Sequence, residues 1–179
     1  MISKTPSSSH NLMPVPKRIH WGNGHLRIDS SFAVRVEGNP DIRIYKGVAR
    51  MVRRLAGRTG LFLPQSFFSK EADTLKSAQM LIRIKRPGKV VFGENESYHL
   101  KIEPQSIVLE AETDIGALRG LETFLQLLDA DDKGYFLPVV EINDAPRFPW
   151  RGLLIDACRH FMPVEVIKRN LDGMAAVKI

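Results

Sequence analysis

The N-terminal part of the chain alternates apolar and polar residues in short stretches. The segment FAVRVEG (32–38) alternates apolar with charged side chains, which predicts a strand with one buried face. Two shorter strands are predicted before it, at 18–21 and 26–28, with Gly22-Asn23-Gly24 as the turn between them. The folded part of the chain is therefore expected to begin with β structure.

A helical period replaces this alternation in the next segment. Asn39 and Pro40 suit the N-cap and first position of a helix that is predicted to run to about Arg58. Gly57 and Gly60 are suitable end points. The apolar residues recur at the 3.6-residue spacing of one helix face: Ile44, Tyr45, Val48, Met51, Val52 and Leu55.

Three later stretches return to a period of two. They are QMLIRIKR (79–86), YHLKIEP (98–104) and SIVLEAET (106–113), with a tight turn at Pro104-Gln105 between the last two. We interpret them as adjacent antiparallel strands.

A second helix and one more strand complete this unit. Asp114 is expected to cap the helix, whose apolar face consists of Leu118, Leu121, Phe124, Leu125 and Leu128. Residues 135–144 predict a strand, and Pro138 places it at an edge or at an irregular position, because proline cannot donate a ladder hydrogen bond. The pattern predicts an α+β fold, with a mostly antiparallel sheet and both helices on one face.

Two prolines indicate a domain boundary. Pro146 and Pro149, in the sequence NDAPRFPW, fix two φ angles and remove two backbone donors. The expected division is a polar, serine-rich disordered leader at 1–13, an accessory α+β domain at 14–143 and the start of a second domain at 144–179.

The second unit has the pattern of one repeat of an α/β protein. RGLLIDACR (151–159) predicts an apolar strand, and Pro163 starts a helix with one apolar stripe: Val164, Ile167, Leu171, Met174 and Ala175. A lone strand and helix keep open edges, and each large aliphatic side chain left in water forgoes about 1.5–3 kcal/mol. We therefore expect this unit to be the truncated start of a larger domain.

Composition and charge exclude little. The 179 residues are 44% hydrophobic and 26% charged, as in ordinary globular proteins. No apolar run approaches the roughly 20 residues that span a bilayer, and no signal peptide is visible, so no membrane partner is expected. A net charge of +6 suggests nucleic acid, but no basic motif interleaved with aromatic residues supports such a partner.

Single residue types offer few candidate sites. The densest basic cluster has helical spacing and is interpreted as a solvated helix face: Arg50, Arg53, Arg54 and Arg58. Cys158, the only cysteine, is expected to be a small buried hydrophobe. No metal-ligand spacing and no cofactor signature are present, so neither a metal nor a cofactor is expected.

A specific motif lies at the start of the second unit. It consists of Pro146-Arg147-Phe148, Arg151-Gly152, Asp156, Arg159-His160-Phe161, Pro163, Asp172, Met174, Ala175 and Lys178. This series closely resembles the opening of the catalytic barrel in family 20 glycoside hydrolases, the β-N-acetylhexosaminidases. The end of that family's smaller α+β domain is similar to Gly116, Gly120-Leu121-Glu122-Thr123 and Gln126-Leu127-Leu128.

The resemblance implies that residues 144–179 begin a (β/α)8 TIM barrel of a glycoside hydrolase. Such enzymes hydrolyse terminal β-linked N-acetylglucosamine or N-acetylgalactosamine with retention, and the substrate's own 2-acetamido oxygen is the nucleophile. The family's Asp-Glu pair, which supplies the proton donor, is expected beyond Ile179, so this chain is expected to hold no catalytic residue and to be inactive. The implied partner is a glycan, and the family is commonly periplasmic, secreted or lysosomal.

Arg151 is the one residue here to which the resemblance gives a role, in substrate binding. In the family this arginine hydrogen-bonds sugar hydroxyls, a task that suits a rigid fork of five donors. Without the resemblance, an arginine at a strand start is typical of a solvated or salt-bridged end. Barrel sites lie at the C-terminal ends of strands, so the side chain of Arg151 has to reach along the barrel axis.

Three polar residues follow where the predicted strand gives way to a loop. Asp156, Arg159 and His160 are interpreted as a mutually satisfied network; the alternative is an acid, a clamp and a base. Trp150 is a candidate platform for a sugar ring, and Trp21 is a second one.

A different class of function stays open from the residues alone, namely a stand-alone α+β module that binds carbohydrate or protein without catalysis. The glycan, its gluco or galacto configuration and the oligomeric state are also left open.

Overall fold

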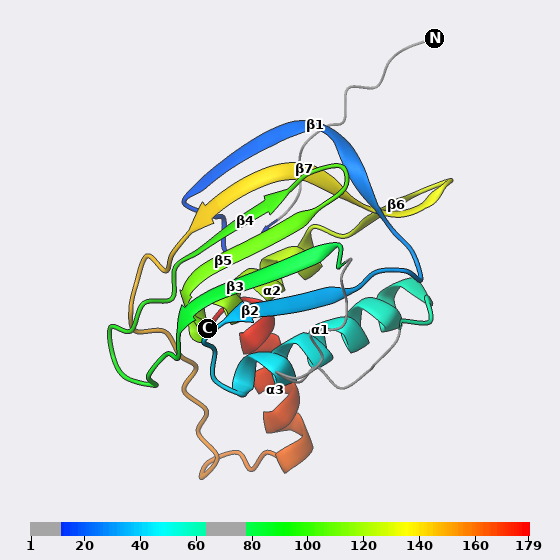
Figure 1. Cartoon of the computed structure of the whole chain (residues 1–179). Helices are drawn as coiled ribbons and strands as arrows, with labels where there is room; N and C mark the ends of the chain where they lie inside the picture. The colour runs from blue at the N-terminus through cyan, green and yellow to red at the C-terminus, as the bar shows by residue number, and fades with distance from the viewer. Residues whose placement is uncertain (1–11, 64–77) are drawn as a thin grey trace.

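A seven-stranded sheet with helices packed against it forms the body of the computed structural model, which describes residues 12–63 and 78–179 (Figure 1). Its strands are β1 (Arg18–Ile28), β2 (Val34–Gly38), β3 (Met80–Arg86), β4 (Tyr98–Ile102), β5 (Ile107–Thr113), β6 (Asp129–Asp131) and β7 (Gly134–Asp144). Its helices are α1 (Arg43–Thr59), α2 (Asp114–Gln126) and α3 (Val164–Ala176). The predicted α+β class is confirmed.

The sheet mixes parallel and antiparallel pairs. Its order is β1-β7-β4-β5-β3-β2, and β6 pairs with β7 alone. β3 runs parallel to both β2 and β5, whereas the other pairs are antiparallel. The prediction of three adjacent antiparallel strands is therefore wrong for residues 79–86. The connection that contains α1 joins β2 to β3 as parallel neighbours, and two chain reversals between β3 and β5 restore the same direction.

β1 is one strand where two strands and a turn were predicted. It pairs with β7 on both sides of a register shift between Trp21 and His25. A Cβ on Gly22 would lie 2.5 Å from Cγ1 of Val139, and Gly24 has a φ of +92°. The glycines therefore form an irregularity within the strand, because pairing with β7 continues past them.

β7 is an internal strand, so the irregular position predicted for Pro138 is the alternative that holds. Pro138 lies between the residues that pair with β6 (134–136) and those that pair with β4 (140–144). On the side of β7 that pairs with β4 and β6, the missing N–H of Pro138 therefore interrupts no ladder of hydrogen bonds.

The helix starts differ from the predicted ones by a few residues. α1 begins at Arg43 rather than at Pro40, and the Asp41 carboxylate accepts a hydrogen bond from the Arg43 N–H at 3.0 Å. Gly60, with a φ of +69°, ends it as predicted. Thr113 rather than Asp114 caps α2, since its Oγ1 accepts from the Gly116 N–H at 3.1 Å.

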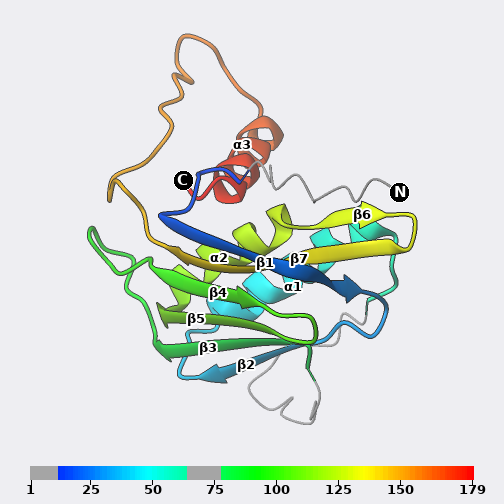
Figure 2. The ribbon, with the colours of Figure 1, turned by 90° about the horizontal axis from the view of Figure 1, so that it is seen from above.

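The core lies between one face of the sheet and the two helices α1 and α2, which confirms that both helices cover the same face (Figures 1 and 2). Alternate residues of β3 and β5 point into it, and the predicted stripe of α1 packs against them. Its fully buried members include Ile44, Leu55, Met80, Ile82, Ile84, Leu100, Ile107, Leu109 and Phe124.

Residues 145–163 leave the end of β7 and reach α3 without forming a strand (Figure 2). The strand predicted for RGLLIDACR is therefore absent from this part of the described chain, and Leu154 is 95% exposed. A strand needs a neighbour for its backbone groups, and no described segment supplies one. Cys158 is exposed rather than buried because it lies in this connection. The helix predicted after Pro163 is confirmed.

The N-terminal end of the described chain contacts the body of the molecule. Leu12 belongs to the core, and the Met13 N–H donates to Oε1 of Gln126 at 2.8 Å. Residues 1–11 of the predicted leader lie outside the described residues. Among the described helices, none is long and apolar enough to cross a bilayer.

Candidate functional site

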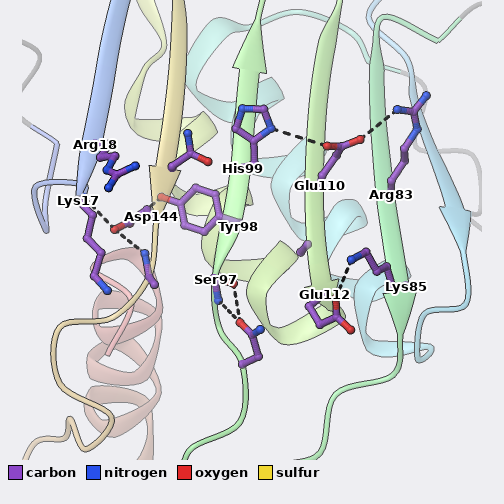
Figure 3. A pocket seen from close by; sticks show the side chains of 14 residues that line it. Lys17, Arg18, Arg83, Lys85, Ser97, Tyr98, His99, Glu110, Glu112 and Asp144 are labelled. Atoms are coloured by element: carbon purple, nitrogen blue, oxygen red, sulfur yellow. Dashed lines mark hydrogen bonds and ion pairs between the residues drawn. The ribbon is translucent and has the colours of Figure 1, made fainter.

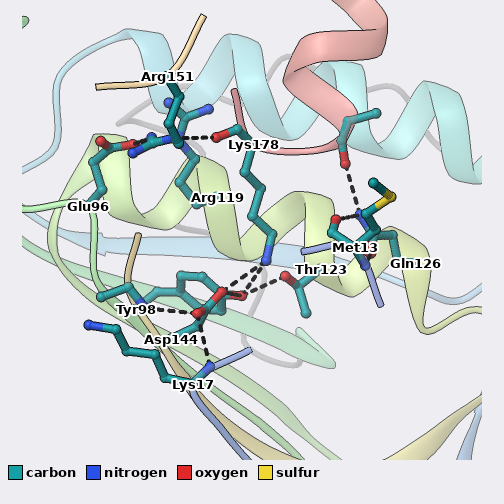
Figure 4. A network of polar contacts seen from close by, with 12 residues as sticks. Met13, Lys17, Glu96, Tyr98, Arg119, Thr123, Gln126, Asp144, Arg151 and Lys178 are labelled. Atoms are coloured by element: carbon teal, nitrogen blue, oxygen red, sulfur yellow. Dashed lines mark hydrogen bonds and ion pairs between the residues drawn. The ribbon is translucent and has the colours of Figure 1, made fainter. Parts of the chain in front are cut away.

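Arg151 lies in the connection between β7 and α3, and its side chain is only 18% exposed. Its guanidinium makes three hydrogen bonds, and Figure 4 shows its place between Glu96 and Lys178. Nη2 donates to Oε2 of Glu96 at 2.6 Å, Nη1 to the Phe148 carbonyl at 2.6 Å, and Nε to the Lys178 carbonyl at 3.0 Å. The guanidinium is therefore held in one orientation by Glu96 of the α+β unit and by two carbonyl groups of the segment that follows β7.

Glu96 joins Arg151 to the α+β unit. It lies just before β4, and its Oε2 also accepts from Nε of Arg119 on α2 at 2.7 Å. One carboxylate oxygen thus receives two guanidinium donors, an arrangement of charge-assisted hydrogen bonds that orients both arginines.

A buried polar cluster lies next to these arginines. Nζ of Lys178 donates to the Tyr98 hydroxyl at 2.9 Å and to Oδ2 of Asp144 at 3.0 Å. The Tyr98 hydroxyl donates to the same Asp144 oxygen at 2.9 Å and lies 2.6 Å from Oγ1 of Thr123. We call these four residues the Lys178 cluster.

Burial and charge act on the ionisable groups of the Lys178 cluster in opposite directions. Burial lowers the pKa of the Lys178 ammonium, and the nearby Asp144 carboxylate only partly offsets this. Burial, together with the negative charge of Asp144, raises the pKa of the Tyr98 phenol well above its ordinary value. The phenol therefore stays protonated and able to donate to Asp144.

A cavity of about 380 Å³ opens beside Arg151 and the Lys178 cluster. Its walls carry positive side chains and two carboxylates, with apolar surface from the N-terminal segment and the connection: Arg119, Arg147, Arg151, Lys178, Glu96, Asp144, Pro14, Val15 and Phe148. Both carboxylates of the wall are already paired with cations, at distances of 2.6 to 3.0 Å.

A larger hollow of about 780 Å³ lies on the open face of the sheet (Figure 3). Several of its charged side chains pair with one another across the strands. Arg83 Nη1 lies 3.1 Å from Glu110 Oε1, and Lys85 Nζ lies 3.0 Å from Glu112 Oε2. This pairing is typical of a solvated sheet surface.

Asp156 and Arg159 form a local network of hydrogen bonds in the connection. This agrees with the interpretation of these residues as a mutually satisfied network. The Asp156 carboxylate accepts from the N–H groups of Cys158 and Arg159 at 3.1 and 3.0 Å and from Nε of Arg159 at 2.5 Å. These hydrogen bonds lower the pKa of Asp156, the largest contribution coming from the Arg159 N–H. His160 joins this turn through its backbone N–H, which lies 3.4 Å from the Asp156 carbonyl.

The tryptophans and the basic cluster have separate surroundings. Trp150 is 81% exposed, with its ring 6.3 Å from that of Phe92, and Trp21 packs against the core. The solvated face predicted for the arginines of α1 is wrong for the half-buried Arg54, whereas Arg58 is exposed but bonded to α2. Arg54 binds the buried Glu122 of α2, and Arg58 donates to the Leu125 carbonyl at 2.6 Å. Their long side chains reach back across α2, which the helical spacing does not reveal.

Sequence reasoning assigned no role to the residues that surround Arg151. Glu96, Tyr98 and Asp144 lie at the ends of strands, where polar residues are ordinary. Lys178 is the last position of the recognised motif, which is the one available signal for it. In the described ranges, no group of three or more His, Cys, Asp or Glu residues is arranged to hold a metal ion.

Two family models match the chain. One, described as beta-acetyl hexosaminidase like, matches residues 12–127. The other, the catalytic domain of glycosyl hydrolase family 20, matches residues 148–179.

Curated relatives match nearly all of the chain. Over 173 residues it is 36% identical to beta-hexosaminidase subunit A1 of Dictyostelium discoideum. The aligned region covers 94% of this chain and 31% of that protein. Over 200 residues it is 34% identical to beta-hexosaminidase 1 of Arabidopsis thaliana, covering 98% and 36%. The chain therefore spans about a third of the length of these relatives.

Solved structures share the fold. The chitobiase of Flavobacterium johnsoniae superposes with a TM-score of 0.90 at 47% identity, covering 94% of this chain and 26% of that one. The N-acetyl-β-hexosaminidase of Streptomyces plicatus, in complex with Thio-NAglucal, gives a TM-score of 0.73 at 25% identity, covering 93% and 33%. Fold and matches together place the chain in a family of glycoside hydrolases. It belongs to glycosyl hydrolase family 20, because a model of that family covers more than half of its residues.

Proposed function

We propose that this chain provides the first part of an exo-β-N-acetylhexosaminidase, which removes terminal β-linked N-acetylglucosamine or N-acetylgalactosamine from a glycan. The observation that carries the proposal is the match of residues 12–127 and 148–179 to the two domains of one family. The Streptomyces plicatus relative, a structure of which holds Thio-NAglucal, supports an acetamido sugar as the ligand.

The proposed reaction is substrate-assisted. The acetamido oxygen attacks C1 of the sugar while a glutamic acid protonates the departing glycosidic oxygen, and water then opens the cyclic intermediate with net retention. An adjacent aspartate orients and stabilises the acetamido group. The 179 residues contain no Asp-Glu dipeptide, so on this proposal the pair comes from outside them and these residues alone are inactive.

We further propose two domains, an accessory α+β domain at 14–143 and a (β/α)8 barrel that starts within 144–179. In the barrel, Arg151 binds sugar hydroxyls. Support comes from its place in the Arg-Gly motif and from its position in the wall of the 380 Å³ cavity. Its donors now bind Glu96, Phe148 and Lys178, so sugar binding requires the guanidinium to exchange at least one of these contacts.

Hydrolysis of aryl glycosides tests the function. The polypeptide from the complete reading frame should release p-nitrophenol from the N-acetyl-β-glucosaminide or the N-acetyl-β-galactosaminide, and NMR should show the β-anomer first. The aryl β-glucoside, which lacks the acetamido nucleophile, is the control and should be stable. Equal rates on both kinds of substrate contradict the substrate-assisted mechanism, and turnover by the 179 residues alone contradicts their proposed inactivity.

A further inference from the structure

Lys178 is the most deeply placed residue of the segment that follows β7. It is 6% exposed, and every other residue from 145 to 179 is half-buried or exposed. α3 itself has no buried residue. The segment that matches the catalytic-domain model thus has one buried side chain, and that side chain is a cation.

The partners of Lys178 come from three separate elements of the α+β unit. Tyr98 begins β4, Thr123 lies on α2, and Asp144 ends β7. All of their contacts within the Lys178 cluster are 3.0 Å or shorter (Figure 4). The side chain of Lys178 therefore extends from the end of α3 to the edge of the core of the α+β unit.

The backbone of Lys178 is adapted to this placement. It is the one non-glycine residue of the described chain with a positive φ, +63°. Such a conformation persists only where surrounding contacts hold it. Its carbonyl also accepts from Nε of Arg151 at 3.0 Å, so the same residue contacts the connection on one side and the core on the other.

A second contact holds the end of α3. Nε2 of Gln126, the last residue of α2, donates to the Ala176 carbonyl at 2.8 Å and to the Met13 carbonyl at 2.9 Å. This contact is partly exposed, whereas the side chains of Lys178 and Asp144 are only 7% and 11% exposed, so their charges pair in a setting of lower dielectric.

We propose that Lys178 is a latch that locks α3 onto the α+β unit, so that the two regions matched by different family models move as one body. The latch depends on the paired charges. With the lysine gone, the largely buried Asp144 carboxylate loses its cation and keeps as donors the Tyr98 hydroxyl and the N–H groups of Lys17 and Ala145, and undocking of α3 gives it more water.

Hydrogen exchange on the 179-residue chain tests the latch, with Lys178→Met as the variant and Lys168→Met, an exposed lysine on α3, as the matched control. The amides of α3 are expected to exchange at least tenfold faster in Lys178→Met, while those of β3 and β5 keep the wild-type rate. Lys168→Met should match the wild type throughout. Unchanged exchange of α3 in Lys178→Met overturns the proposal.

A tyrosine titration read at 295 nm gives a signature that differs from general destabilisation. The chain has three tyrosines, and only Tyr98 lies in the cluster. If α3 stays docked, loss of a cation cannot make this phenol easier to ionise. If α3 leaves, water reaches Tyr98, and its phenol should ionise with the ordinary tyrosine pKa of about 10. Ionisation of one more phenol near this pH in folded Lys178→Met than in the wild type supports the latch, and no difference between the two chains overturns it.

Two further variants extend the test, and the first, Tyr98→Phe, keeps it decisive if Lys178→Met fails to fold. Tyr98→Phe keeps the ring and removes only the shared hydroxyl, so it should also accelerate exchange of α3 selectively. Asp144→Asn combined with Lys178→Met removes both charges and should slow exchange relative to Lys178→Met. A Tyr98→Phe chain with wild-type exchange, or a double variant at least as fast as Lys178→Met, contradicts the charge-paired latch.

Discussion

The Nζ atom of Lys178 lies 3.0 Å from Oδ2 of Asp144, and both side chains are almost wholly buried. This ion pair joins the end of β7 to the turn after α3, two positions that the connection 145–163 separates widely along the chain (Figure 2). The 145–163 connection has no regular structure of its own, so contacts such as this one determine where α3 lies.

Removal of the carboxylate should be costly. Asp144→Ala leaves the Lys178 ammonium buried without its counter-charge, which is expected to lower the free energy of unfolding by about 3–5 kcal/mol. Urea denaturation measures the change. Asp132→Ala, at an exposed turn position, is the control and should stay within about 0.5 kcal/mol of the wild type. Equal losses for both variants contradict the importance of the pair.

Arg151 should contribute through the geometry of its fork as well as its charge. In the complete enzyme, Arg151→Lys keeps the charge and is expected to lower kcat/KM for an aryl N-acetylglucosaminide by about 10–150-fold, the range for one lost charge-assisted hydrogen bond. Arg169→Lys, at an exposed position of α3 outside the motif, is the control and should retain near wild-type kinetics. Wild-type kcat/KM in Arg151→Lys removes Arg151 from the proposed site.

The stability of the fold should fall in acid because the Glu94 carboxylate becomes protonated. Hydrogen bonds from Arg86, Lys89 N–H and Asn95 N–H lower the pKa of Glu94 from 4.5 to about 2. Because the folded-state pKa is depressed, the stabilisation is complete above pH 4.5 and is lost as the pH falls toward about 2. Glu94→Gln should therefore lose less Tm than the wild type between pH 5 and pH 3, read by circular dichroism. Glu165→Gln, an exposed site, should follow the wild-type curve, and parallel curves for all three chains contradict this assignment.

Two glycines should respond to alanine in opposite directions. Gly38 has a φ of +94°, and a Cβ there would lie 1.9 Å from the Ile84 carbonyl oxygen. Gly38→Ala is expected to destabilise by about 2–6 kcal/mol from strain and overpacking. Gly57 lies inside α1, and a Cβ there would have no neighbouring atom within 4 Å, so Gly57→Ala should stabilise by about 0.5–1 kcal/mol. Thermal unfolding of both variants distinguishes these signs; a neutral Gly38→Ala is the contrary result.

Periodicity located most of the elements but not how they pair. The stretches 79–86 and 106–113 are strands as predicted, yet they lie side by side in parallel. Alternation shows which face of a strand is buried and carries no information about its neighbour. The signal at Gly22-Asn23-Gly24 favours a turn locally, and pairing of β1 with β7 overrides it.

The motif indicated the family but not the surroundings of its residues. Arg151 was recognised from Arg-Gly, whereas its contact with Glu96 joins residues 55 positions apart. Such a contact has no local signature, because the fold alone determines which charged residues become neighbours.

By itself the sequence determined the class of fold, the apolar faces of α1 and α2, and membership of a glycosidase family, because side-chain spacing and motif order are local properties of the chain. Only the tertiary structure decided the order of the strands, the ties from Arg54 and Arg58 to α2, and the burial of Lys178 against Tyr98 and Asp144. These depend on which distant segments share a dry interface, where a charge is stable only if the fold brings its partner within hydrogen-bond distance.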